Sequence, residues 1–104
     1  MTVRARVRVR TPGLRLPMPL PTRSLMLRLG TDAEGRPWLM GMELDVPERV
    51  TLLPGEDGLV AEAEFWYDDA ARHLRPSAAY PLWYGDEVGT LEVLDLRSHA
   101  GGER

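Results

Sequence analysis

Hydrophobic and polar residues alternate strictly along Val3–Arg10, which reads VRARVRVR. Successive side chains of a β-strand point to opposite faces, so a period of two is typical of a strand with one buried face. The pattern predicts that the valines and Ala5 turn inward. It also predicts a ladder of four arginines on the outer face: Arg4, Arg6, Arg8 and Arg10.

Similar runs recur downstream, separated by polar segments or by proline and glycine. We expect strands over residues 24–29, 37–46, 49–53, 59–67, 80–84 and 88–96. The polar segment Gly30–Arg36 is expected to join the first two of these as a hairpin. Only Asp68–Leu74 fits a helical turn, with Asp68 or Asp69 as its N-cap.

The segment between the first two strands is rich in proline, with Pro12, Pro17, Pro19 and Pro21 close together. Proline lacks a backbone N–H group and does not occupy a central strand or a helix interior. We therefore predict an extended, loop-like crossover here.

Six or seven short strands without a substantial helix predict an all-β fold, a single small antiparallel β-barrel with Greek-key-like connections. We assign residues 1–97 to this domain and 98–104, with Gly101-Gly102, to a flexible tail. The predicted core consists of Val3, Val7, Val9, Leu25, Leu27, Met40, Met42, Leu44, Val60 or Leu59, Phe65, Leu82, Val88 and Val93.

Composition narrows the class of protein. The 104 residues contain no cysteine, which excludes a disulfide framework and suits a cytoplasmic protein. No apolar run reaches the roughly 18 residues of a membrane helix, and the arginines of the first strand interrupt any signal-peptide core. Lysine, isoleucine, asparagine and glutamine are absent as well, which indicates a GC-rich genome.

Charge is unevenly distributed. Residues 1–30 contain seven arginines and no carboxylate, whereas all sixteen carboxylates lie between Asp32 and Glu103. This asymmetry suggests either a basic arm for a partner or two halves that neutralise each other. Arg15, Arg23 and Arg28 would extend the ladder into a larger basic patch.

The ladder itself admits two interpretations. Arginines on one strand face recur about every 6.6 Å, close to the phosphate spacing of an extended nucleic-acid strand, about 6–7 Å. Glu62 and Glu64 repeat with the same period, as do Glu43 and Asp45, so a neighbouring strand would pair its carboxylates with the arginines. The net charge of −3 argues against a polyanionic partner.

The second half of the chain carries a characteristic series of turn and strand residues: Pro54-Gly55-Glu56, Leu74, Pro76, Tyr80, Leu82, Gly85 and Val88-Gly89. Over residues 50–96 this series resembles the C-terminal β-barrel of elongation factor Tu, and the strand VRARVRV suits the first strand of that barrel. The resemblance implies a stand-alone barrel from a family in which these strands help to hold transfer RNA and the exchange factor.

The chain departs from that family at several points. Ser77 stands where the family has glycine, and the stretch LRLPMPLPTRSLML replaces the family's Gly-Gly-Arg and Arg-Pro-Gln-Phe, so that only Arg23 matches. The chain has no G-x-x-x-x-G-K-[ST] loop and no lysine to serve in one, so we expect no nucleotide binding and no GTP hydrolysis.

Three tryptophans, Trp38, Trp66 and Trp83, are assigned to the outer phase of their strands. A tryptophan on an outer face is often an interface anchor. The alternative is a second small core under the proline-rich loop, since large apolar residues also cover the open ends of barrels.

Catalytic candidates are few. Asp69 and His73 would meet across one helical turn, but a metal site needs three or four ligands and no others cluster there. None of the serines lies in a Gly-x-Ser-x-Gly elbow. We therefore expect no metal, no cofactor and no enzyme, with an Asp69/His73 site as the residual alternative.

The sequence predicts a non-enzymatic interaction module that binds a protein partner or self-associates as a homodimer. An RNA-binding barrel is the alternative, and neither version involves a membrane. The candidate binding residues are Arg4, Arg6, Arg8, Arg10, Arg23, Arg28, Trp66 and Trp83.

Overall fold

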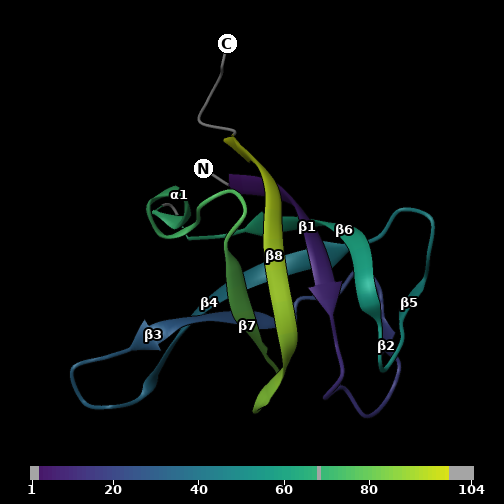
Figure 1. Cartoon of the computed structure of the whole chain (residues 1–104), viewed down its shortest axis with the longest axis horizontal. Helices are drawn as coiled ribbons and strands as arrows, with labels where there is room; N and C mark the ends of the chain where they lie inside the picture. The colour runs from purple at the N-terminus through teal and green to yellow at the C-terminus, as the bar shows by residue number, and fades with distance from the viewer. Residues whose placement is uncertain (1–2, 68, 99–104) are drawn as a thin grey trace.

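The fold is described from a computed structural model, which covers residues 3–67 and 69–98. Six antiparallel strands pair in a closed ring (Figure 1). In ring order they are β1 (Val3–Arg10), β6 (Asp57–Phe65), β4 (Pro37–Asp45), β3 (Met26–Thr31), β7 (Ala79–Trp83) and β8 (Glu87–Ser98), and β8 pairs with β1 again. The all-β class and the six antiparallel strands are thus confirmed.

Chain order and ring order differ in an informative way. β3 and β4 form a hairpin, as predicted, and so do β7 and β8. β1, however, lies between β6 and β8 rather than beside β3. Among the strands of the ring, β6 is the fourth in chain order, and it returns to lie beside the first, β1. This is the arrangement of a Greek key.

The inward phase of the strands forms the core, because alternation places every second side chain inside the ring. All predicted core residues are buried except at one point in β6, where Val60 is 39% exposed and Leu59 is only partly buried. This end of β6 is irregular, since the β1–β6 register shifts between Val9 and Arg10. Further buried residues come from strands, loops and α1: Leu14, Met18, Leu52, Ala61, Ala63, Ala70, Leu74 and Leu91.

The proline-rich crossover is extended, as predicted, but it also forms a strand of two residues. β2 (Met18–Pro19) pairs with β5 (Thr51–Leu52) as a separate two-stranded sheet. Thr11, at the start of the crossover, is fully buried and fixes it to the loop after β5: its Oγ1 donates to the Leu53 carbonyl at 3.0 Å and accepts from the Glu56 N–H at 3.2 Å.

One short helix, α1 (Ala70–His73), follows β6. Asp69 occupies the N-cap position, one of the two predicted, although its side chain makes no capping hydrogen bond; Asp68 lies outside the described residues. No helix in the described residues has the length and apolar character to cross a membrane. β8 continues to Ser98, one residue into the predicted tail, and 99–104 lie outside the described residues.

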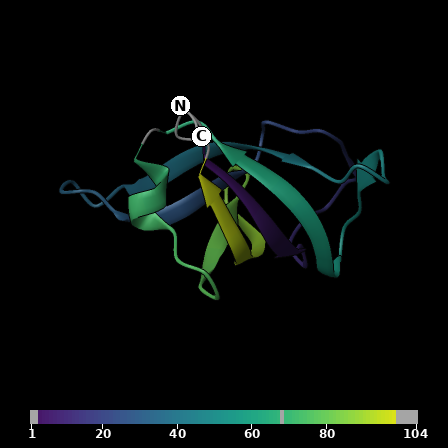
Figure 2. The same cartoon turned by 90° about the horizontal axis from the view of Figure 1, so that it is seen from above.

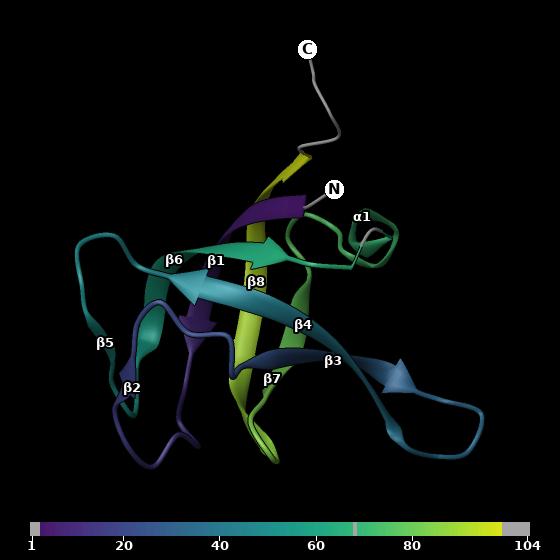
Figure 3. The same cartoon turned by 180° about the vertical axis from the view of Figure 1, so that it is seen from behind.

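The β3–β4 hairpin extends beyond its neighbours in the ring (Figures 1 and 3). β3 pairs with β7 only at Met26 and Leu27, and β4 pairs with β6 only from Met42 to Asp45. Residues 28–41 therefore form an arm, which we call the β3–β4 arm, whose strands pair only with each other.

Candidate functional site

The arginine ladder lies between two strands that carry carboxylates. On the β6 side, Arg4 is opposite Glu64, Arg6 is opposite Glu62 and Arg10 is opposite Asp57. On the β8 side, Arg6 is opposite Asp95 and Arg8 is opposite Glu92. Of the two carboxylate pairs that could lie beside the ladder, Glu62 and Glu64 do so, whereas Glu43 and Asp45 are on β4, which does not pair with β1.

Among the described residues, three ion pairs join the ladder to these strands. The distances are 3.8 Å for Arg4–Glu64, 3.5 Å for Arg8–Glu92 and 3.1 Å for Arg10–Asp57. All these groups are partly exposed, so each pair contributes only about 0.2–1 kcal/mol. Their larger effect is on the surface potential, because a carboxylate beside each arginine offsets the field that would attract a polyanion.

Arg23 and Arg28 do not extend the ladder, contrary to the prediction. Arg28 is on β3, which lies across the ring from β1, and Arg23 pairs with Glu43 of β4 at 3.1 Å. Both guanidinium groups lie over tryptophan rings, Arg23 over Trp66 at 5.6 Å and Arg28 over Trp83 at 5.7 Å from the ring centroids. The basic patch is thus divided between opposite sides of the molecule.

Trp66 and Trp83 frame an apolar row on the outer face. Met26 of β3 lies opposite Trp83 of β7 on one side and opposite Gly41 of β4 on the other. A Cβ on Gly41 would lie 3.0 Å from the Trp66 ring, so that ring covers the glycine. The outward orientation of Trp66 is confirmed by its 43% exposure, and Trp83 is partly exposed.

Trp38 was assigned to the wrong face. It shares the phase of the inward-facing Met40, but at this end of β4 the inward phase meets α1 rather than the core. Its ring contacts His73 edge-on, with centroids 4.7 Å apart, and Tyr67 stacks on the same imidazole at 5.9 Å.

These contacts also correct the Asp69/His73 hypothesis. His73 packs between aromatic rings, while Asp69 lies 4.0 Å from Arg72 and has no ion pair with His73 among the described residues. Nor do those residues contain a group of three or more His, Cys, Asp or Glu side chains placed to hold a metal ion.

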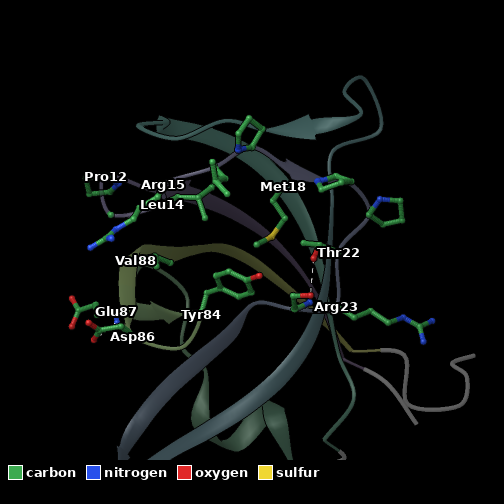
Figure 4. Close-up of a pocket in the computed structure, with 16 residues that line it drawn as sticks. Pro12, Leu14, Arg15, Met18, Thr22, Arg23, Tyr84, Asp86, Glu87 and Val88 are labelled. Carbon is green, nitrogen blue, oxygen red and sulfur yellow. Dashed lines mark hydrogen bonds between the residues drawn. The ribbon is translucent and has the colours of Figure 1, made fainter.

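A groove that the sequence did not reveal runs beneath the proline-rich crossover (Figure 4). We call it the crossover groove; it has a volume of about 1100 Å³, and its walls are residues 12–19 and 21–24 on one side and Tyr84 and 86–88 on the other. Leu16 at its rim is 74% exposed and Tyr84 is 51% exposed. The backbone brings these walls together, since the Gly13 N–H donates to the Val88 carbonyl at 2.8 Å.

Charges of both signs flank the apolar surface of this groove. Figure 4 shows Arg15, Asp86 and Glu87 toward one end and Arg23 toward the other. Tyr84 lies between them, with Met18 on the facing wall (Figure 4). The arrangement provides apolar contact area flanked by side chains of both signs.

No family model, curated protein or solved structure matches this chain. The likeness to the elongation factor Tu barrel therefore stays a prediction from the sequence.

Proposed function

We propose that this protein is a non-enzymatic interaction module that binds an extended segment of a protein partner in the crossover groove. The observation that carries the proposal is the groove itself, about 1100 Å³ in volume and lined by exposed apolar side chains. A concave surface with many apolar and a few polar groups is the usual form of a binding site, and exposed apolar patches of this kind mark interaction surfaces.

The charges favour a polypeptide over a nucleic acid. Asp86 and Glu87 stand with Arg15 at one end of the groove, where they would offset its attraction for a phosphate backbone, whereas a peptide supplies side chains of either sign. The arginine ladder is a weaker candidate for RNA than its sequence suggested, because carboxylates of β6 and β8 lie opposite it.

We also propose that the closed sheet is a barrel of the elongation factor Tu C-terminal type. The Greek-key order of its strands supports this. So does Ser77, which has a φ of 71° at the position where that family has glycine, the residue that adopts positive φ most easily. A cytoplasmic location remains our expectation and is supported by the absence of cysteine.

Selection of a random peptide library on the immobilised protein tests the binding function. The peptides that it enriches should bind the wild type and fail to bind Leu16→Glu, which places a charge on the groove rim. Val50→Glu is the matched control, because Val50 is 78% exposed but does not line the groove. Failure to enrich any peptide, or equal loss of binding in both variants, would contradict the proposal.

A labelled single-stranded RNA tests the alternative in the same assay. The internal pairing of the ladder predicts little binding even at low salt. Strong binding with a steep salt dependence, abolished by replacing Arg4, Arg6 and Arg8 with alanine, would favour the RNA module instead.

A further inference from the structure

In the part of the chain that the structure describes, the outer edge of β4 has no partner strand along Pro37–Gly41. β3 pairs with these residues on one side, but on the other side β6 ends at Phe65, opposite Met42. After β6 the chain turns away from β4 and runs toward α1 (Figure 3). Backbone N–H and C=O groups along such an edge form a ready template for another strand.

A hollow borders this edge, and α1 meets it at the contact between His73 and the Trp38 ring. A pocket of about 410 Å³ is lined by Trp38, Leu39, Met40 and Gly41 from the edge itself, and by Trp66 and Tyr67 from the segment that leaves it. α1 lies beyond, beside the β3–β4 arm (Figure 2). The pocket shows that the described part of the chain leaves room next to the edge.

The edge lacks the usual protection against pairing. Its five residues, Pro37–Gly41, include no charged side chain, and only the initial proline removes a backbone donor. Natural proteins normally blunt a free edge with charges, bulges or prolines along its length. The aromatic rings beside this edge are also poorly covered, since Trp38, Trp66 and Tyr67 are each between 39% and 44% exposed.

The free edge of β3 in the same arm provides an internal comparison. A bulge separates Arg28 from Gly30, and a bulge bends a strand away from flat pairing. The guanidinium of Arg28 also donates to the Gly30 carbonyl at 3.4 Å and to Thr31 Oγ1 at 3.2 Å, so it lies along this strand. One edge of the arm is thus protected and the other is open.

We propose that the open edge of β4 pairs with the same edge of a second copy of this chain. An uncharged edge meets itself without like-charge repulsion, and a two-fold axis is the commonest symmetry of protein dimers. Antiparallel pairing about Leu39 places Trp38 opposite Met40 of the second copy and Pro37 opposite its Gly41. Pro37 of one copy then lies beside the Trp66 ring of the other copy, which covers Gly41 there. The aromatic side chains around the pocket become buried in this dimer.

This dimer leaves the crossover groove free, since no residue of Pro37–Gly41 lines that groove. The two proposals therefore stand or fall separately. Loss of self-association would leave peptide binding in the groove intact, and failure of peptide selection would say nothing about the dimer.

Sedimentation velocity of the full chain, from low-micromolar to near-millimolar concentration, tests the dimer. The wild type should sediment as a dimer as the concentration rises. Leu39→Lys places two like charges at the centre of the paired edges and should raise the dissociation constant at least about tenfold. A wild type that stays monomeric, or a correctly folded Leu39→Lys variant that dimerises as well as wild type, would overturn the proposal.

A cysteine variant tests the register without introducing charge. Because the chain contains no cysteine, Leu39→Cys provides a single thiol, and side chains opposite each other on antiparallel strands have Cβ atoms about 4.5–5.5 Å apart. A short bismaleimide should cross-link Leu39→Cys rapidly to a covalent dimer. Val50→Cys, whose thiol would be exposed just before β5, should stay largely monomeric. Equal cross-linking of the two variants would count against the β4 edge.

Discussion

Thr11 offers the most direct test of how the crossover is held over the groove. Its side chain is fully buried and its hydroxyl serves two partners, the Leu53 carbonyl and the Glu56 N–H. The backbone adds two more bonds, from the Thr11 N–H to the Glu56 carbonyl at 3.0 Å and from the Gly55 N–H to the Thr11 carbonyl at 2.8 Å. Thr11→Val keeps the shape of the side chain and the backbone bonds but removes both bonds of the hydroxyl.

The expected loss follows from the two partners left behind. A buried donor or acceptor without a partner costs about 1–3 kcal/mol. Leu53 and Glu56 are not fully buried, so water replaces part of the lost bonding and about 2 kcal/mol is expected in total. With an m-value of about 2 kcal/mol/M for a domain of this size, the urea midpoint should fall by about 1 M.

Urea unfolding followed by tryptophan fluorescence measures this change. Thr22→Val is the matched control, because Thr22 is also buried but its Oγ1 accepts only one local bond, from the Ser24 N–H at 3.1 Å. The control should lose less than half as much stability. If Thr11→Val cost no more than Thr22→Val, the hydroxyl of Thr11 would not anchor the crossover and our account of the groove wall would be refuted.

Three further substitutions test other parts of the structure. Gly89→Ala should destabilise the fold by more than about 3 kcal/mol, because its Cβ would lie only 1.8 Å from the Arg10 carbonyl oxygen; a thermal midpoint near that of wild type in circular dichroism would contradict this close approach. Ser77→Gly should raise the unfolding free energy by about 0.5–1 kcal/mol in a denaturant titration, because it relieves a positive φ; a decrease would argue against it. A double-mutant cycle on Arg8 and Glu92 should give a coupling of about 0.2–1 kcal/mol that diminishes with salt, and a larger, salt-independent value would show that the pair is more than a surface contact.

The strands could be predicted because their signal is local. In Val3–Arg10 the alternation alone specifies which side chains are buried, and the structure agrees at every described position. The carboxylates that face the arginine ladder could be predicted only in part. Glu62 and Glu64 were candidates because they share its period, but nothing indicated the carboxylates of β8. Which strands become neighbours depends on the closure of the whole ring, and this information is spread over the chain.

The candidate sites were harder to predict for the same reason. The crossover groove brings Leu16 and Tyr84 together from distant parts of the sequence, and proline density was the only local signal for it. Trp38 was misplaced because the inward side of a strand faces the core only where the ring is closed, and at the end of the arm it faces His73. The sequence suggested Asp69 as the partner of His73 because the two lie four residues apart, but tertiary packing places His73 against Trp38 and Tyr67.

The position of β1 governs the order in which this fold can be completed. β1 pairs along its length with β8, from Val3 opposite Ser98 to Arg10 opposite Thr90. The ribosome synthesises β1 long before β8. One edge of β1 therefore stays unpaired until β8 has been synthesised. Pairing between such distant segments slows folding, and the waiting edge is open to the strands of other nascent chains. We therefore expect ring closure to be the late, rate-limiting step of folding. The carboxylates of β6 and β8 opposite the arginines of β1 should favour pairing of β1 with these two strands.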